Sequence, residues 1–201
     1  MAFRKFKDIG EVLVAFDLDY QSKNFIDGKG RKAPERLVLD IDYVIEKLPY
    51  EVSEAAIGEM ILFPILKEVW RHFDDKLMLW SHKSISHSKT LGGIPDYLIA
   101  KQSKRGKVVL DKPYLAVVEA KKDDFEGGWA QCATEMYAMQ QINGQPEVTI
   151  FGIVSNGDNW EFAKLEGNLF TRQPMFIPLL PIDQIYAVLY ELLEECAKYL
   201  K

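Results

Sequence analysis

The sequence feature that most constrains the fold is a pair of short apolar runs separated by a polar segment. The runs span residues 94–100 and 114–118, with Glu119 and Ala120 directly after the second, and residues 101–107 between them are polar and contain a glycine. Runs of this kind with such a connection are typical of an antiparallel β-hairpin. In this pairing Asp96 and Glu119 lie opposite each other, because the midpoint between them falls at residues 107 and 108, beside the polar connection.

The hairpin would bring two carboxylates and an ammonium group together. Alternate residues of a strand share a face, so Glu119 and Lys121 point the same way, ~6.6 Å apart along the strand. Opposed residues such as Asp96 and Glu119 have Cβ atoms ~5 Å apart. Two carboxylates at that spacing repel each other, and a divalent cation with oxygen ligands would relieve the repulsion. The alternative is that these are ordinary charges at strand ends, with Lys121 neutralising a neighbour.

Three short segments together resemble the motif of the PD-(D/E)XK nuclease superfamily. They are Pro95-Asp96, residues 119–121 (Glu-Ala-Lys) and residues 127–131 (Gly-Gly-Trp-Ala-Gln), and the resemblance covers roughly residues 50–155. It implies an α/β fold, a restriction-endonuclease-like mixed β-sheet flanked by helices with an αβββαβ core and added N-terminal and C-terminal helices. We expect one domain over residues 1–201, with its core at about residues 50–165.

The resemblance also implies a set of site residues. Asp96 and Glu119 would hold one or two Mg²⁺ ions, or Mn²⁺, with the Ala120 carbonyl as a further oxygen ligand. Lys121 would position the attacking water or stabilise charge in the transition state. Glu54 and Gln131 would complete the site.

Glu54 belongs to a predicted helix over residues 52–70. Ser53 can cap the helix start, apolar residues recur at helical spacing, and Pro64 predicts a kink or a boundary between two helical pieces. In the superfamily a glutamate commonly lies about ten residues before such a proline, which fits Glu54 and not Glu59. The alternative for Glu54 is a favourable charge at a helix start.

Gln131 belongs to a second predicted amphipathic helix, over residues 125–141. Gln131 and Glu135 are four residues apart and share a face of this helix. The resemblance assigns Gln131 to the active site. For Glu135 an exposed helical carboxylate is the commoner case, and for Trp129 core packing is the favoured interpretation over stacking on a base.

Composition limits the class of protein. The chain has 201 residues, of which 48% are hydrophobic, enough for one well-packed domain. Cys132 and Cys196 lack metal-ligand spacing and are predicted to be buried thiols of a reducing compartment. No apolar stretch approaches the ~20 residues of a membrane span, so we expect a cytoplasmic protein without a membrane partner.

Net charge argues against general attraction to a nucleic acid, because the formal value is −5. The charge is uneven, however: residues 81–112 hold seven Lys or Arg against two Asp. The basic segment is either a solvated loop or one wall of a nucleic-acid groove.

The remaining chain predicts further elements of a continuous fold. Helices are expected at 34–48 and 182–200, a strand at 76–86, a loop at 21–33, and a hairpin at 148–154 and 160–165. Residues 10–19 fit a strand or a helix. The chain lacks phosphate-loop and dinucleotide-binding motifs, and His82 and His87 are more typical of surface groups than of a metal site.

These observations lead to three hypotheses. The first is a Mg²⁺-dependent endonuclease-like phosphodiesterase that hydrolyses DNA. The second is a non-catalytic nuclease-like domain that binds nucleic acid or a protein. The third is a toxin or phage-related module that acts on RNA. A homodimer is compatible with the first, because duplex cleavage commonly uses two sites.

Overall fold

The computed structural model describes residues 6–88 and 91–200. The helices are α1 (Ile9–Phe16), α2 (Glu35–Lys47), α3 (Glu54–Ile57), α4 (Phe63–Trp70), α5 (Phe125–Asn143) and α6 (Ile182–Lys198), with a π-helical turn η3 (Gly58–Leu62) between α3 and α4. The strands are β1 (Asp19–Ser22), β2 (Leu77–Ser81), β3 (Ile85–Ser86), β4 (Gly92–Gly93), β5 (Tyr97–Lys101), β6 (Asp111–Ala120), β7 (Ile150–Ser155), β8 (Asn159–Glu166), β9 (Leu169–Arg172) and β10 (Ile177–Pro178).

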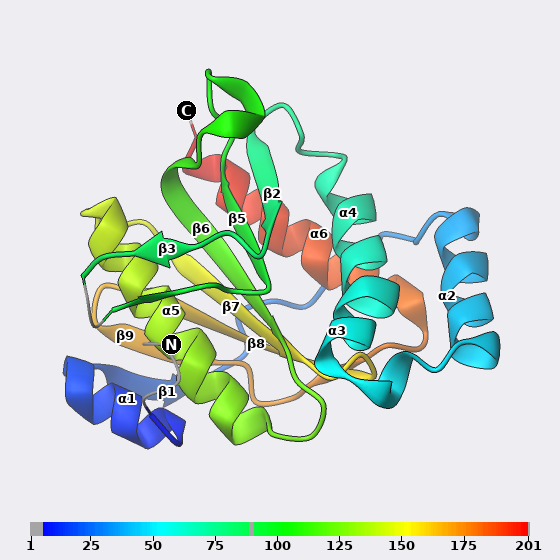
Figure 1. The fold of residues 1–201 in the computed structure, drawn as a ribbon, viewed down its shortest axis with the longest axis horizontal. Helices are drawn as coiled ribbons and strands as arrows, with labels where there is room; N and C mark the ends of the chain where they lie inside the picture. Colours follow the sequence, from blue (N-terminus) through cyan, green and yellow to red (C-terminus); the bar gives the residue numbers. More distant parts are fainter. Residues whose placement is uncertain (1–5, 89–90, 201) are drawn as a thin grey trace.

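A large mixed β-sheet forms the centre of the molecule (Figure 1). Its strand order is β1-β9-β8-β7-β6-β5-β2, and β10 pairs with β8. The β6–β7 and β1–β9 pairs are parallel, whereas the other pairs in the sheet are antiparallel. The expected α/β class with a mixed sheet flanked by helices is therefore confirmed.

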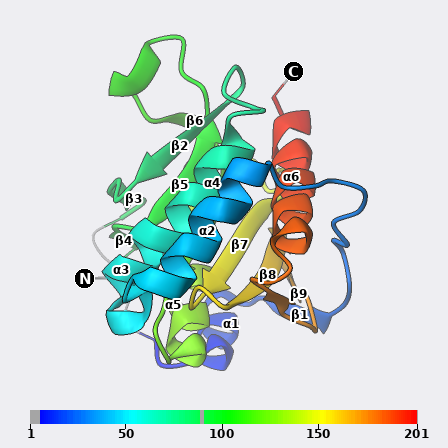
Figure 2. The same cartoon turned by 90° about the vertical axis from the view of Figure 1, so that its right-hand side faces the viewer.

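Helices cover both faces of the sheet (Figures 1 and 2). Helix α5 packs on β6 and β7 with α1 against it, while α4 and α6 contact each other on the opposite side. Strands β5, β6 and β7 are almost fully buried, which explains why their sequences are continuous apolar runs rather than alternating patterns. Helix α5 is the crossover between the parallel strands β6 and β7.

The predicted pairing of residues 94–100 with residues 114–120 is confirmed. Tyr97 pairs with Val118 and Ile99 with Ala116, but the register shifts on either side of Ala100 as the strands approach their connection. The basic connection lies beyond the opposite end of β5 from Asp96. Five strand residues separate the two, or ~16 Å at 3.3 Å per residue, so the connection does not lie directly beside Asp96.

The helical segment before β2 is divided as Pro64 suggested. The Ser53 hydroxyl accepts a hydrogen bond from the Ala56 backbone N–H at 3.1 Å and caps α3. Pro64 lies in the first turn of α4, where a missing N–H costs nothing. The π-helical turn before α4 brings Gly58 close to Tyr97, since a Cβ at Gly58 would lie 3.1 Å from the Tyr97 hydroxyl.

Several elements differ from expectation. The strand predicted over residues 76–86 is interrupted after Ser81, because His82 adopts a left-handed backbone conformation with φ of 49°. Residues 10–19, which fitted either type, contain α1, and the loop predicted from residue 21 begins within β1. The strand β9 that pairs with β1 was not predicted.

The expected burial of three side chains is confirmed. Cys132 and Cys196 are buried free thiols, and Trp129 is buried in the core. Within residues 6–88 and 91–200, we find no helix with the length and apolar character to cross a bilayer.

Candidate active site at the end of the β5–β6 hairpin

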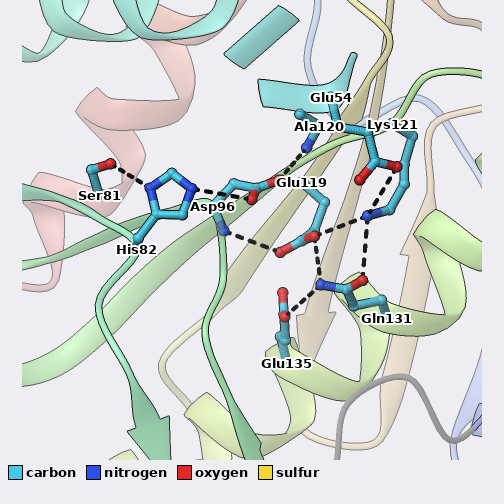
Figure 3. Close-up of polar contacts among 9 residues, drawn as sticks. All are labelled: Glu54, Ser81, His82, Asp96, Glu119, Ala120, Lys121, Gln131 and Glu135. Carbon is cyan, nitrogen blue, oxygen red and sulfur yellow. Dashed lines mark hydrogen bonds and ion pairs between the residues drawn. The ribbon is translucent and has the colours of Figure 1, made fainter. Parts of the chain in front are cut away.

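Asp96 and Glu119 face each other at one end of the β5–β6 hairpin (Figure 3). The Asp96 backbone N–H donates to Glu119 Oε1 at 3.3 Å, and the Ala120 backbone N–H donates to Asp96 Oδ2 at 2.8 Å. These backbone-to-side-chain bonds lie just beyond the Tyr97–Val118 pair, where the β5–β6 ladder ends. The predicted opposition of the two carboxylates is therefore confirmed, and backbone hydrogen bonds hold both side chains in place.

Lys121 adds an ammonium group to the same site. Its side chain is buried, and Nζ lies 3.3 Å from Glu119 Oε2 and 3.9 Å from Glu54 Oε1. The stem of Lys121 packs against Gly128 in the first turns of α5. A Cβ at Gly128 would lie 2.7 Å from Lys121 Cγ and 3.0 Å from Val154 Cγ1, so the absence of a side chain there makes room for the lysine.

Gln131 connects the carboxylates to the ammonium group. Its Nε2 donates to Glu119 Oε2 at 2.6 Å and to Glu135 Oε1 at 3.1 Å, while Oε1 accepts from Lys121 Nζ at 3.3 Å. This amide orientation follows from chemistry, since carboxylates only accept and an ammonium only donates. Gln131 therefore sets the distance between Lys121 and Glu119.

Glu135 is fully buried, which corrects the expectation of an exposed helical carboxylate. Its Oε1 accepts from Gln131, whereas Oε2 is buried without a hydrogen-bond partner among the described residues. Burial first, and then the charge of Glu119, raise the pKa of Glu135 well above its ordinary value.

Glu119 is also difficult to ionise in this environment. Burial, followed by the charge of Asp96, raises the pKa of Glu119 to about 7, although contacts with Glu135 and Lys121 oppose the shift. A buried carboxyl with a second carboxylate beside it is a typical surrounding for a raised pKa. Such a pair is also a typical place for a cation, because positive charge stabilises ionised Glu119 against both its burial and the charge of Asp96.

Glu54 lies at the opening of the site. Its side chain is 45% exposed, and with Lys121 and Gln131 it lines a cavity of about 370 Å³. Phe6, Lys7, Asp124 and Gly127 complete the lining. The segment that carries Lys7 is anchored by aromatic contacts, since Phe6 meets Phe16 edge-on at 5.6 Å and Phe16 stacks on Tyr137 of α5 at 4.1 Å.

The oxygen donors fit a hard divalent cation that keeps part of its water shell. Asp96 and Glu119 supply two carboxylates, and Ala120, whose N–H binds Asp96, supplies a carbonyl beside them. Mg²⁺ is commonly held by one or two carboxylates together with waters and substrate oxygens. No group of three His, Cys, Asp or Glu side chains suited to a metal occurs in the described part of the chain.

Sequence reasoning found most members of this cluster and missed three. Glu54, Asp96, Glu119, Ala120, Lys121 and Gln131 are brought together in this region. Lys7 was missed because the N-terminal segment is distant in sequence, and Glu135 was discounted as a surface charge. Gly128 was considered only as part of a motif. A glycine one turn before Gln131 was the available signal that another side chain, here Lys121, packs against the helix at that position.

Comparisons with known proteins add no assignment, because neither the protein-family models nor the curated proteins searched contain a match to this chain. The chemistry of the site therefore has to follow from its own residues.

Proposed function

We propose that this chain is a divalent-metal-dependent nuclease that hydrolyses phosphodiester bonds of DNA. The observation that carries the proposal is the convergence of Asp96, Glu119 and Lys121, from neighbouring strands, within hydrogen-bond or ion-pair distance. The order of elements supports it: helices α3 and α4, strands β2, β5 and β6, helix α5 and strand β7 follow the αβββαβ order of the PD-(D/E)XK nucleases.

The carboxylates of Asp96 and Glu119, with the Ala120 carbonyl, would hold Mg²⁺ or Mn²⁺. When bound, the ion supplies positive charge to the phosphoryl oxygens and lowers the pKa of a coordinated water. Asp96 is kept in place by the Ala120 N–H, and Glu119 by the Asp96 N–H and the Gln131 amide. The protein thus orients both ligands before the substrate arrives, which is a condition for efficient catalysis.

Lys121 would stabilise the negative charge that develops on the phosphoryl group. Its ammonium is buried between Glu119, Gln131 and Glu54 and is placed without reorganisation. Fixed charge in a site with little water is worth more than the same charge in bulk solvent. Glu54 and Gln131 act by holding Lys121, and Glu54 also faces the opening through which substrate would enter.

Plasmid nicking tests the proposal. We expect the purified protein to nick supercoiled DNA in Mg²⁺ or Mn²⁺ and not in EDTA. The variants Asp96→Ala and Lys121→Ala should lose the activity by about 10²-fold or more. If both variants cut as well as the parent, the assignment is wrong.

A non-catalytic domain that binds nucleic acid or a protein is the second candidate. The net charge of −5 argues against general attraction to nucleic acid, so it favours the protein-binding form of this candidate. Binding of DNA without cleavage in either metal would support it. A labelled single-stranded RNA in the same assay distinguishes an RNA-directed enzyme from a DNA-directed one.

A further inference from the structure

His82 lies directly beside Asp96, across the end of the β2–β5 ladder. Ser81 pairs with Tyr97, and the next residue on each strand is His82 and Asp96. The His82 backbone N–H donates to the Asp96 carbonyl oxygen at 2.9 Å. Residues opposed in this way have side chains close enough to interact.

The backbone of His82 adopts a conformation that a glycine would adopt more easily. Its φ is 49°, and the one other non-glycine residue with positive φ in the described part of the chain is Asp17, the C-cap of α1. A left-handed conformation is strained for a residue other than glycine, and such strain is found preferentially at functional sites. A side chain retained there in place of glycine suggests a use for the imidazole.

The imidazole is held between a hydroxyl and the Asp96 carboxylate (Figure 3). Nδ1 lies 2.8 Å from Ser81 Oγ, and Nε2 lies 3.7 Å from Asp96 Oδ1. A carboxylate oxygen only accepts, so the compatible tautomer carries its hydrogen on Nε2 and accepts from Ser81 at Nδ1. The ring also meets Tyr97 edge-on at 6.2 Å, which limits its rotation.

The two oxygens of Asp96 therefore have different neighbours. Oδ2 accepts the Ala120 N–H at 2.8 Å, whereas Oδ1 faces the imidazole at a distance longer than a hydrogen bond. Hydrogen bonds in active sites are often long before ligands bind and shorten afterwards. Neighbours of this kind orient metal-binding carboxylates, and their removal typically lowers metal affinity 10–100-fold.

We propose that His82 is a positioning residue that, through Nε2–H and Asp96 Oδ1, orients the Asp96 carboxylate for the divalent cation. The inference rests on the proposed function and adds a residue outside the superfamily motif. Ser81 contributes by fixing the tautomer. The imidazole is reachable from solvent, with its side chain 65% exposed, so replacing it should leave the core intact.

Titration calorimetry with Mn²⁺ alone, on protein stripped of metal, tests the proposal. His82→Asn and His82→Gly both remove the imidazole at a position where Asn and Gly tolerate the left-handed backbone. We expect each to raise the Mn²⁺ Kd about tenfold or more, with an unchanged or higher melting temperature in EDTA. Ser81→Ala should shift the Kd in the same direction.

The matched control is His87→Asn, an exposed histidine of the same segment, which should bind Mn²⁺ like the parent. Kd values within twofold of the parent for both His82 variants would overturn the positioning role, as would an equal loss in His87→Asn. If Asp96→Asn abolishes binding while the His82 variants do not, only the role of His82 fails. A parent protein that binds no Mn²⁺ would overturn both the proposed site and this inference.

Discussion

At one end of the β5–β6 hairpin Glu119 and Lys121 are buried and hydrogen-bonded to each other and to Gln131, while at the other end Lys104 and Arg105 are exposed. At the site end, beside Asp96 and Glu119, the β5–β6 pairing keeps a regular register. At the connection end, beside residues 101–107, the register shifts and Val108 is 81% exposed. The charges of the candidate site are thus few, and those of Glu119 and Lys121 are buried. The larger number of basic residues near Asp96 in sequence lies at the wrong end of the strands to act there.

The largest expected effect comes from comparing the loss of one lysine at each end of the β5–β6 hairpin. Lys121→Met should lower plasmid nicking in Mg²⁺ by about 10²-fold or more, because it removes fixed positive charge from the site. Lys104→Met, at the connection end, should change the rate less than twofold. Similar losses in both variants would show that general cationic charge, rather than the placement of Lys121, supports activity.

We expect the free energy of unfolding to depend on pH because of Glu119, at the site end of the hairpin. The pKa of Glu119 is about 7 in the folded state against an ordinary value of 4.5. Between these values the folded protein retains a proton that the unfolded chain releases, so the free energy of unfolding falls as pH rises. Glu119 alone accounts for a fall of about 3 kcal/mol by pH 7, and the raised pKa of Glu135 extends the decline above that pH.

Urea denaturation in EDTA from pH 4.5 to 8 measures this dependence. Glu119→Gln should remove much of the decline, whereas Glu126→Gln, an exposed position on α5, should retain it. Mn²⁺ at pH 8 should restore stability by binding the folded state. A parent protein whose stability rises over this range would contradict the raised pKa of Glu119.

Replacing one glycine at each end of the β5–β6 hairpin compares how tightly the two ends are packed. Gly128→Ala places a Cβ against Lys121 Cγ and Val154 Cγ1, and should cost about 1–3 kcal/mol. Gly106→Ala, in the connection, meets no atom within 4 Å but has φ of 69°, and should cost about 1 kcal/mol. Nicking assays on the folded variants should show reduced activity for Gly128→Ala alone.

The smallest effect is expected from removing two positive charges from the connection, residues 101–107. The double variant Lys104→Gln with Arg105→Gln should change the free energy of unfolding by less than about 0.5 kcal/mol. DNA binding measured against salt concentration should keep its slope. A slope reduced by about two would show that both side chains contact phosphates, and the contrast between the two ends would then need revision.

The sequence predicted the parts of the fold whose signals are local. Residues 94–100 and 114–118 are apolar runs that pair through a short connection, and α5 follows from the pattern of its own residues. Ser53 and Pro64 located the start of α3 and the boundary before α4. The opposition of Asp96 and Glu119 followed from the pairing of the two runs alone.

What could not be predicted depends on contacts between distant segments. Glu135 is buried because α5 lies against the end of β6, and no spacing within the helix reveals that. The π-helical turn at Gly58–Leu62 places Gly58 beside Tyr97, nearly forty residues later, and no local pattern reveals that contact. Likewise, the interruption at His82 follows from the end of the ladder with β5 rather than from any breaker residue in the sequence.

The parallel pairing of β1 with β9 has a consequence for how the chain reaches its native state. Gln21 and Thr171 are joined by a side-chain hydrogen bond across 150 residues of sequence. During synthesis the first twenty or so residues leave the ribosome long before their partner strand exists. Closure of this edge must therefore be a late event, and contacts of such high sequence separation are expected to slow folding. Until then β9 would be an edge strand whose backbone N–H and C=O groups are free to pair with another chain.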